Sequence, residues 1–349
     1  MTGKLIFEDG TEFAGESFGS NTSVAGEVVF STGMMGYPES LTDPSYKGQI
    51  LIFTYPLIGN YGIPDKRFWE SDNIMVSGLV VSSYNDSPSH FQSKKTLASW
   101  FKDENIPLLQ IRDTRLLTQK IRTRGAMLGK IVLEKDIKNY DPNLDNLVEM
   151  VSTEKVIEKA GKKGAKTILL IDCGAKRNIQ RALFKRGINV ITVPWDFDPF
   201  SHPKIKFDGV LISNGPGDPK MAKKTIKTIE KILAQKIPTL GICLGNQLLT
   251  LAAGGDTKKL KFGHRSQNQP CIMEGSERCF ITTQNHGFAV SRVPSGFKPW
   301  FTNANDGTNE GIMHTTLPFM SVQFHPEACP GPTDTEWIFD FFLEKLKKN

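Results

Sequence analysis

Long apolar runs, paired cysteines and nucleotide-binding glycine loops are all missing from this sequence. No eighteen consecutive residues are apolar, and the opening segment, Met1–Gly10, has neither an apolar signal core nor an arginine-rich presequence. We therefore expect no membrane-spanning segment and a cytoplasmic location.

Cysteine is scarce, with five residues in a chain of 349. The odd number and irregular spacing argue against a disulfide framework, and without a Cys-x-x-Cys pair we expect no metal site. The segment nearest to a phosphate-binding loop, Gly125–Lys130, has the wrong spacing and lacks the following Ser or Thr. We therefore expect no cofactor on this chain.

The charge is also modest. A formal net charge of +6 comes largely from lysines scattered along helical stretches, which favours a solvated surface over a nucleic-acid interface. At 349 residues the chain is long enough for two domains with cores of their own.

The hydrophobic pattern divides the chain into two parts. Residues 1–150 contain short β-type runs broken by glycine and proline, whereas residues 167–349 alternate strands with helices, which is typical of a mainly parallel sheet flanked by helices. The charged segment 151–166 between them has little to bury. We expect an α/β protein, with a smaller β-rich α/β domain over 1–150, a linker over 151–166 and a larger α/β domain over 167–349.

The segment Gly241–Gly245 places Cys243 between an apolar strand and a helix, as in a nucleophile elbow. Unpaired N–H groups at the helix start favour the reactive thiolate, although a buried structural cysteine is the alternative. Further along, the segment His325–Glu327 follows another apolar strand. Because Pro326 favours an extended conformation, Glu327 can orient the imidazole of His325 toward a nucleophile.

Two other segments are less specific. Ser213–Pro219 reads as a tight turn whose glycines allow a ligand to approach the backbone, and Gln284–Val290 could line a pocket or form a hairpin. Within the latter segment, His286 is as consistent with a structural role as with a catalytic one.

The segments Gly241–Gln247 and His325–Glu327 together resemble the signature of class I glutamine amidotransferases. Outside it, Leu5–Thr11, Leu41–Tyr46 and Pro326–Pro332 are similar to the small chains of carbamoyl-phosphate synthetases, and the similarity covers both domains. The loop Phe262–Pro270 departs from the usual pattern of that family, which leaves its details near the pocket open.

The resemblance implies a glutaminase mechanism. Cys243 would attack the side-chain amide of glutamine, His325 would carry the proton to the leaving ammonia, and Glu327 would orient His325. Backbone N–H groups of Gly215 and Leu244 would bind the oxyanion that forms on the way to the γ-glutamyl thioester. The resemblance places the following further residues around glutamine: Ser45, Gly217, Gln247, Asn285, Gly287 and Phe288.

The resemblance also implies a partner. Small chains of this family pass ammonia to a large synthetase chain, which uses bicarbonate, ATP and Mg to make carbamoyl phosphate for pyrimidine and arginine biosynthesis. We therefore expect a heterodimeric ligase in which the β-rich domain contacts the large chain. The alternatives are a stand-alone cysteine hydrolase of γ-glutamyl bonds and a non-catalytic interaction subunit.

Overall fold

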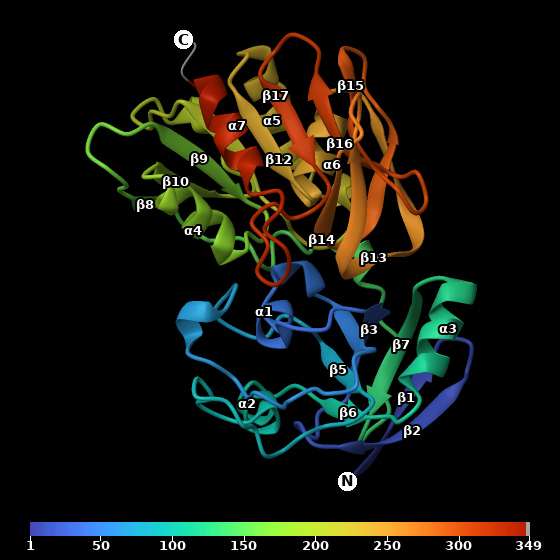
Figure 1. The fold of residues 1–349 in the computed structure, drawn as a ribbon. Coiled ribbons are helices and arrows are strands. Elements are labelled where there is room, and N and C mark those ends of the chain that lie inside the picture. The colour runs from blue at the N-terminus through green and yellow to red at the C-terminus, as the bar shows by residue number, and fades with distance from the viewer. Residues whose placement is uncertain (347–349) are drawn as a thin grey trace. The chain divides into compact units, whose positions relative to one another are not determined.

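In the computed structural model, which describes residues 1–346, the chain forms two compact units. The first unit contains Met1–Asp145 together with Lys261–Ser266, and the second contains Asn146–Leu260 and the chain from Gln267 onward. Figure 1 labels the helices and strands of both units.

The first unit is built on a sheet that closes on itself in the order β1-β2-β6-β5-β4-β3-β7. Its strands are β1 (Thr2–Phe7), β2 (Glu12–Ser17), β3 (Val24–Ser31), β4 (Gln49–Phe53), β5 (Gly78–Val81), β6 (Leu108–Gln110) and β7 (Met127–Val132). Its helices are α1 (Tyr37–Leu41), α2 (Leu97–Asp103) and α3 (Thr114–Arg124), with short 3-10 helices η1 (Pro44–Tyr46), η2 (Lys66–Phe68) and η3 (Pro142–Leu144).

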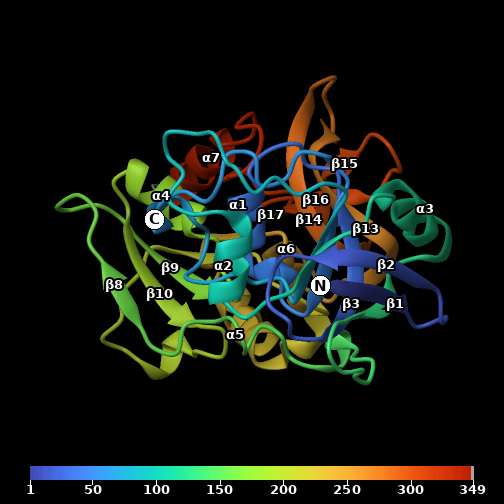
Figure 2. The same cartoon turned by 90° about the horizontal axis from the view of Figure 1, so that it is seen from below.

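Side chains on the two faces of these strands enter different cores, because successive residues of a strand point to opposite sides. On β4, Ile50 and Ile52 pack in the core that also holds residues of α3, whereas Leu51 and Phe53 pack in the core that holds residues of α2. Figure 2 shows α2 and α3 at separate places around the strands. The β-rich α/β character expected for this part of the chain is confirmed.

The second unit is built on a mixed sheet in the order β14-β13-β15-β16-β17-β12-β11-β9-β10-β8. Its strands are β8 (Ile157–Lys159), β9 (Thr167–Asp172), β10 (Asn189–Pro194), β11 (Gly209–Ile212), β12 (Thr239–Ile242), β13 (Asp256–Met273), β14 (Cys279–Arg292), β15 (Phe297–Asn303), β16 (Asn309–His314) and β17 (Phe319–Val322). Its helices are α4 (Arg177–Lys185), α5 (Lys223–Ala234), α6 (Leu244–Ala252) and α7 (Trp337–Lys345), with 3-10 helices η4 (Pro199–Ser201) and η5 (Pro219–Met221).

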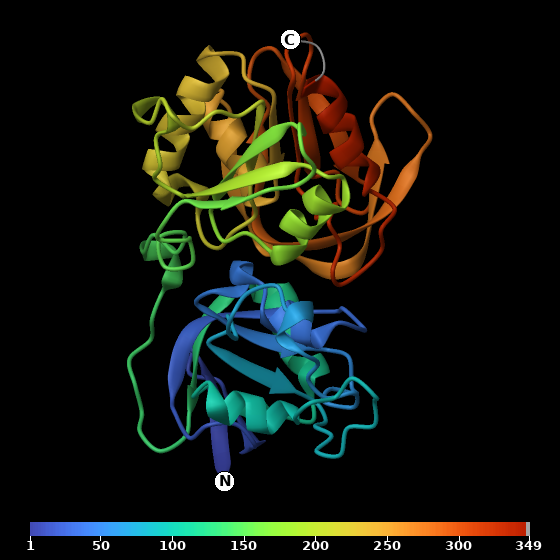
Figure 3. The same ribbon diagram turned by 90° about the vertical axis from the view of Figure 1, so that its left-hand side faces the viewer.

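The central strands β10, β9, β11, β12 and β17 are parallel, as expected from their apolar sequences. Helices cover both faces of this part of the sheet. Residues of α4 and α7 share one core, whereas residues of α5 and α6 share the other. Figure 3 shows α7 on one side of the strands and α5 with α6 on the opposite side.

Two features differ from a simple parallel sheet. Within the segment 151–166, expected as a linker, β8 pairs antiparallel with β10 at the sheet edge. The long strands β13 and β14 add antiparallel pairing at the other edge. Charged composition hides β8 from sequence reasoning, because all three of its residues are exposed and need no apolar side chains.

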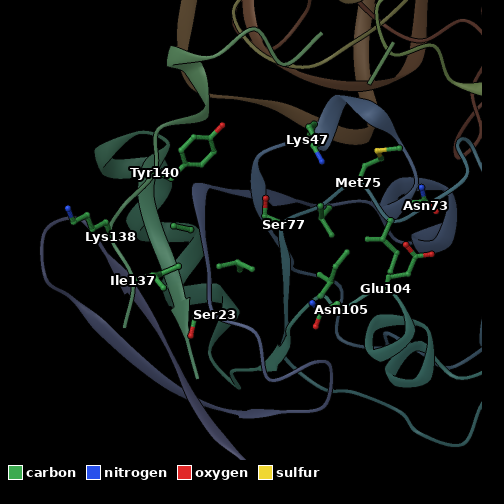
Figure 4. Close-up of a pocket in the computed structure, with 15 residues that line it drawn as sticks. Ser23, Lys47, Asn73, Met75, Ser77, Glu104, Asn105, Ile137, Lys138 and Tyr140 are labelled. Carbon is green, nitrogen blue, oxygen red and sulfur yellow. The ribbon is translucent and has the colours of Figure 1, made fainter. Parts of the chain in front are cut away.

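The first unit also has an open hollow of about 590 Å³, shown in Figure 4. Its rim carries Lys47, Glu104, Asn105, Lys138 and Tyr140. Since no cysteine or histidine lines it, the hollow offers no thiol nucleophile and no imidazole base.

Within the described residues 1–346, no helix has the length and apolar composition needed to cross a bilayer.

Candidate active site

The turn between β12 and α6 holds Cys243 in a strained conformation. Its backbone has φ 53° and ψ −103°, in the half of the map that non-glycine residues rarely enter. The Cys243 N–H donates to the carbonyl of Val322 at 2.8 Å, so β17 holds the turn in place. This geometry is that of the nucleophile elbow predicted from the sequence.

Small neighbours make the elbow possible. A Cβ atom on Gly241 would lie 2.4 Å from the carbonyl oxygen of Gly245, and one on Gly245 would lie 2.2 Å from the carbonyl oxygen of Ile212. Both separations are shorter than Cβ contacts allow, so any larger residue would displace backbone. The spacing of glycines around Cys243 is therefore a packing requirement of the turn.

The structure places His325 and Glu327 together just beyond β17. Nδ1 of His325 lies 2.6 Å from Oε1 of Glu327, and the His325 N–H donates to the carbonyl of Thr283 at 2.9 Å. This pairing places a ring proton on Nδ1 of His325, which donates to the carboxylate of Glu327. Nε2 of His325 has no other hydrogen-bond partner among the described residues and is available to the thiol.

The charges around His325 determine its pKa. Burial by itself would lower the pKa of His325, but the negative charges of Glu327 and Cys243 raise that pKa well above its usual value. The imidazole is therefore an effective proton acceptor for the thiol, and the imidazolium that results is stabilised on both sides.

Lys176, which the sequence analysis did not single out, is part of this group. It is 2% exposed, its Nζ lies 3.1 Å from Oε1 of Glu327, and it also donates to the carbonyl of Ala328 at 2.5 Å. Burial would raise the pKa of Glu327, yet Lys176 and His325 hold it well below its usual value. Lys176 therefore keeps the carboxylate ionised.

Turns at two strand ends hold Lys176 in place. After β9, one carboxylate oxygen of Asp172 accepts from the N–H groups of Gly174 and Ala175, at 2.9 and 2.7 Å. The N–H of Lys176 donates to Oδ1 of Asn214, at the end of β11. Lys176 follows the end of β9 by four residues, which is a weak sequence signal, and the partner that explains it lies about 150 residues away.

Strain is concentrated here. Among the described residues, positive φ at non-glycine positions occurs at Asn105, Lys236, Cys243, Ala328 and Cys329. Three of these five are Cys243 itself and the two residues after Glu327. Such strain persists only where surrounding contacts enforce it, which is typical of functional sites.

The predicted oxyanion donors lie at suitable places in the second unit. Leu244 is the first residue of α6, where a helix provides no internal acceptor for the N–H group. A Cβ on Gly215 would lie 2.1 Å from the carbonyl oxygen of Cys173, so this turn accepts only glycine. Gly217 has φ +82° and packs against Leu147. All three follow strands of the parallel part of the sheet, at their C-terminal ends.

The structure brings the predicted glutamine-binding residues of β14 close to α6. Cys243 Sγ lies 3.7 Å from the carbonyl oxygen of Asn285, and Nε2 of Gln247 donates to the carbonyl of Phe288 at 2.8 Å. Gly287 lies between these two residues of β14. Ser45 lies in η1 of the first unit, and its contact with glutamine stays a prediction.

His286 has a structural environment. Its Nδ1 lies 2.8 Å from the carbonyl oxygen of Phe288, and its Nε2 lies 3.0 Å from Oε1 of Gln284. With both ring nitrogens engaged, His286 cannot serve as the base for Cys243 in this arrangement. Of the two histidines considered from the sequence, only His325 keeps a ring nitrogen available.

Comparison with known proteins identifies both parts of the chain. The family model described as Glutamine amidotransferase class-I matches residues 169–345, and the one described as Carbamoyl-phosphate synthase small chain, CPSase domain, matches residues 5–131.

Relatives resemble the chain along nearly its whole length. Multifunctional protein pyr1-3 of Dictyostelium discoideum is 48% identical over 374 residues, covering 99% of this chain and 17% of that protein. Multifunctional protein URA2 of Saccharomyces cerevisiae is 47% identical over 389 residues, with the same two coverages. The human protein named Carbamoyl-phosphate synthase [ammonia], mitochondrial, is 46% identical over 361 residues, covering 100% of this chain and 24% of that protein. The chain thus spans about a fifth of the length of these relatives.

Proposed function

Because the chain belongs to the class I glutamine amidotransferases and carries a carbamoyl-phosphate synthase small-chain domain before the amidotransferase domain, we propose that it hydrolyses glutamine to supply ammonia for carbamoyl phosphate synthesis. The observation that carries the proposal is the strained Cys243 elbow beside the buried pair of His325 and Glu327. These side chains match the nucleophile, base and orienting group of acyl transfer.

The first half of the reaction forms a thioester. Cys243 Sγ attacks the side-chain carbonyl carbon of glutamine while Nε2 of His325 accepts the thiol proton. The N–H groups of Leu244 and Gly215 stabilise the oxyanion. His325 then protonates the leaving nitrogen and the C–N bond breaks. Ammonia departs, and the γ-glutamyl group remains bound to Cys243 as a thioester.

The second half regenerates the thiol. Water attacks the thioester carbonyl, His325 accepts a proton from that water, and the C–S bond breaks to release glutamate. Glu327 stabilises the imidazolium in both halves, and Lys176 keeps Glu327 ionised. The proton returns from His325 to the sulfur of Cys243.

We place the remaining chemistry on a large synthetase chain, in a heterodimeric arrangement. That chain would bind ATP and Mg and use bicarbonate and the ammonia released here to make carbamoyl phosphate. The relatives named as multifunctional proteins and as carbamoyl-phosphate synthase support a synthetase partner. Pyrimidine and arginine biosynthesis are the pathways that carbamoyl phosphate would feed, and the cytoplasm is the proposed compartment.

A second candidate arises from one relative. The human protein at 46% identity has a name that specifies ammonia, so the present chain could instead serve a synthetase without hydrolysing glutamine. The intact group of Cys243, His325 and Glu327 favours the glutaminase. The stand-alone γ-glutamyl hydrolase would use the same three residues without a synthetase.

The test is Cys243→Ser in the complex purified from its native cell. We expect glutamine-dependent carbamoyl phosphate synthesis to fall by at least about 1,000-fold, while ammonia-dependent synthesis stays within about threefold of wild type. Cys279→Ser, at an exposed cysteine, is the matched control and should change neither rate. Undiminished glutamine-dependent synthesis in the Cys243 variant would refute the proposal, and purification without a synthetase chain would favour the stand-alone hydrolase.

A further inference from the structure

Ser321 in β17, and Gln323 and His325 just after it, are buried polar residues at a place in the sheet where apolar residues are expected. β17 pairs with β12 on one side and β16 on the other, and strands enclosed in this way are usually apolar on both faces. Ser321, Gln323 and His325 are nevertheless at most 1% exposed. They alternate along the chain with the apolar residues Val322 and Phe324. Buried polar groups are costly unless they are hydrogen-bonded, so each needs partners.

Gln323 has a partner for each end of its amide. Its Oε1 accepts from Nδ2 of Asn246 and from Nε2 of Gln247, both at 3.1 Å, and its Nε2 lies 3.7 Å from Sγ of Cys243 as a donor. Two amide donors on one oxygen fix which end of the Gln323 side chain faces the sulfur. Ser321 fixes Asn246 in turn, because its hydroxyl donates to Oδ1 of Asn246 at 2.8 Å.

The N–H donor of Gln323 affects Cys243 when the thiol loses its proton. A sulfur anion in a buried site is stabilised by N–H donors and destabilised by nearby oxygen acceptors. The sulfur of Cys243 also lies 3.7 Å from the carbonyl oxygen of Asn285, which can only accept. Gln323 is therefore the side-chain amide placed to stabilise the thiolate.

The acceptor oxygen of Gln323, Oε1, determines the orientation of the Gln247 amide. One hydrogen of its Nε2 is directed to the carbonyl of Phe288 and the other to Oε1 of Gln323. With both hydrogens used, the side-chain oxygen of Gln247 is the atom left to accept from the α-ammonium group of glutamine. Gln323 thereby fixes which end of the Gln247 amide is left for the α-ammonium group.

We propose that Gln323 is a positioning residue that ties the nucleophile to the glutamine pocket through one amide, which donates to Cys243 and accepts from Gln247. This inference rests on the proposed glutaminase function. It predicts that the two halves of the Gln323 amide act on different measured quantities.

Two variants separate the halves. Gln323→Glu keeps an oxygen for Asn246 and Gln247 but replaces the donor to the sulfur with a second oxygen. We expect alkylation of Cys243 by iodoacetamide at neutral pH to slow about tenfold, with its pH profile moved to higher pH, while KM for glutamine changes less than about threefold. Gln323→Leu also removes the acceptor, so alkylation should slow similarly and KM should rise about tenfold.

Alkylation is followed by mass spectrometry of the peptide that contains Cys243, and KM by release of glutamate from the complex. Gln180→Glu is the matched control, because its half-buried amide donates to the hydroxyl of Thr192 outside the site, and it should behave as wild type. Circular dichroism and thermal melting check that each variant is folded. If Gln323→Leu does not fold, the alkylation profile of Gln323→Glu decides.

Two results would overturn the inference. One is a Gln323→Glu protein that alkylates at the wild-type rate with the wild-type pH profile, and the other is a folded Gln323→Leu protein whose KM rises no more than that of Gln323→Glu. Because alkylation needs no glutamine, a wild-type protein without glutaminase activity would refute the proposed function and leave the alkylation test in force. Normal glutaminase activity with unchanged alkylation of Gln323→Glu would refute this inference alone.

Discussion

Cys173 and Cys243 each follow a parallel strand of the same sheet, and both are almost completely buried. At the end of β9, Cys173 lies in an apolar core with Val148 and Ile171, and burial with the nearby Asp172 charge raises the pKa of its thiol far above the usual value. At the end of β12, Cys243 occupies a strained turn and its charge acts on a buried histidine. Burial is common to both thiols, so backbone conformation and a proton acceptor distinguish the reactive one.

Replacing each of the two cysteines with alanine tests this comparison, and we expect the largest effect of the three tests on glutamine hydrolysis. Cys243→Ala should lower glutamine hydrolysis by at least about 1,000-fold, whereas Cys173→Ala should stay within about threefold. Cys173→Ala should instead lower the free energy of unfolding by about 1 kcal/mol, because it leaves a small cavity in an apolar core. Glutamate release and urea unfolding measure the two effects. Comparable losses of activity in both variants would remove the distinction.

A second test addresses the turn itself, through the two glycines at opposite ends of α6. Gly245→Ala would force a methyl group against the carbonyl of Ile212, so we expect a loss of about 1–3 kcal/mol of stability and about 100-fold in kcat. Gly254→Ala meets nothing within 4 Å and has only the cost of φ +87°. We expect about 1 kcal/mol and an unchanged kcat there. Equal kcat in the two variants would show that the elbow geometry is not needed.

The third and smallest effect concerns His325, the proton acceptor beside Cys243. Burial lowers the pKa of an imidazole, so Glu327→Gln should move the pKa of His325 downward by about 1–3 units, as measured by NMR titration of the ring. An unchanged titration would mean that Glu327 does not tune the base.

The same variant changes stability with pH. The raised pKa of His325 stabilises the fold below its ordinary value of 6.5 and ceases to do so as pH rises through the folded-state value. The lowered pKa of Glu327 stabilises the fold above its ordinary value of 4.5 and ceases to do so as pH falls. Wild type and Glu327→Gln should therefore differ most in unfolding free energy between pH 4.5 and 6.5. A difference independent of pH would contradict the ion pair.

Much of the site could be predicted because its signals are local. The elbow depends on glycines two residues either side of Cys243, and His325 and Glu327 are only two residues apart. A turn, in which the Ala328 N–H donates to the His325 carbonyl at 3.1 Å, joins that pair in place of the extended conformation expected from Pro326. Lys176 and Gln323 were missed for the opposite reason. Each has partners far away in the sequence, so neither spacing nor composition marks it. The polar alternation Ser321, Gln323, His325 in an otherwise apolar strand was the available clue.

The fold divides in the same way. Apolar runs of four to six residues predicted the parallel strands β9, β11 and β12, because strands buried on both faces carry continuous hydrophobic sequence. The closure of the first sheet could not be predicted, because it depends on pairing β1 with β7 across more than a hundred residues. The edge strand β8 has an exposed sequence that resembles a loop.

The central place of β17 has a consequence for the order of events during synthesis. This strand is inserted between β12 and β16, yet it leaves the ribosome after both of them. Until residues 319–327 emerge, Cys243 has neither the Val322 carbonyl that holds its turn nor the imidazole that accepts its proton. The nascent chain therefore carries a thiol without a base, and the elbow meets its proton acceptor only after the interior of the sheet is complete.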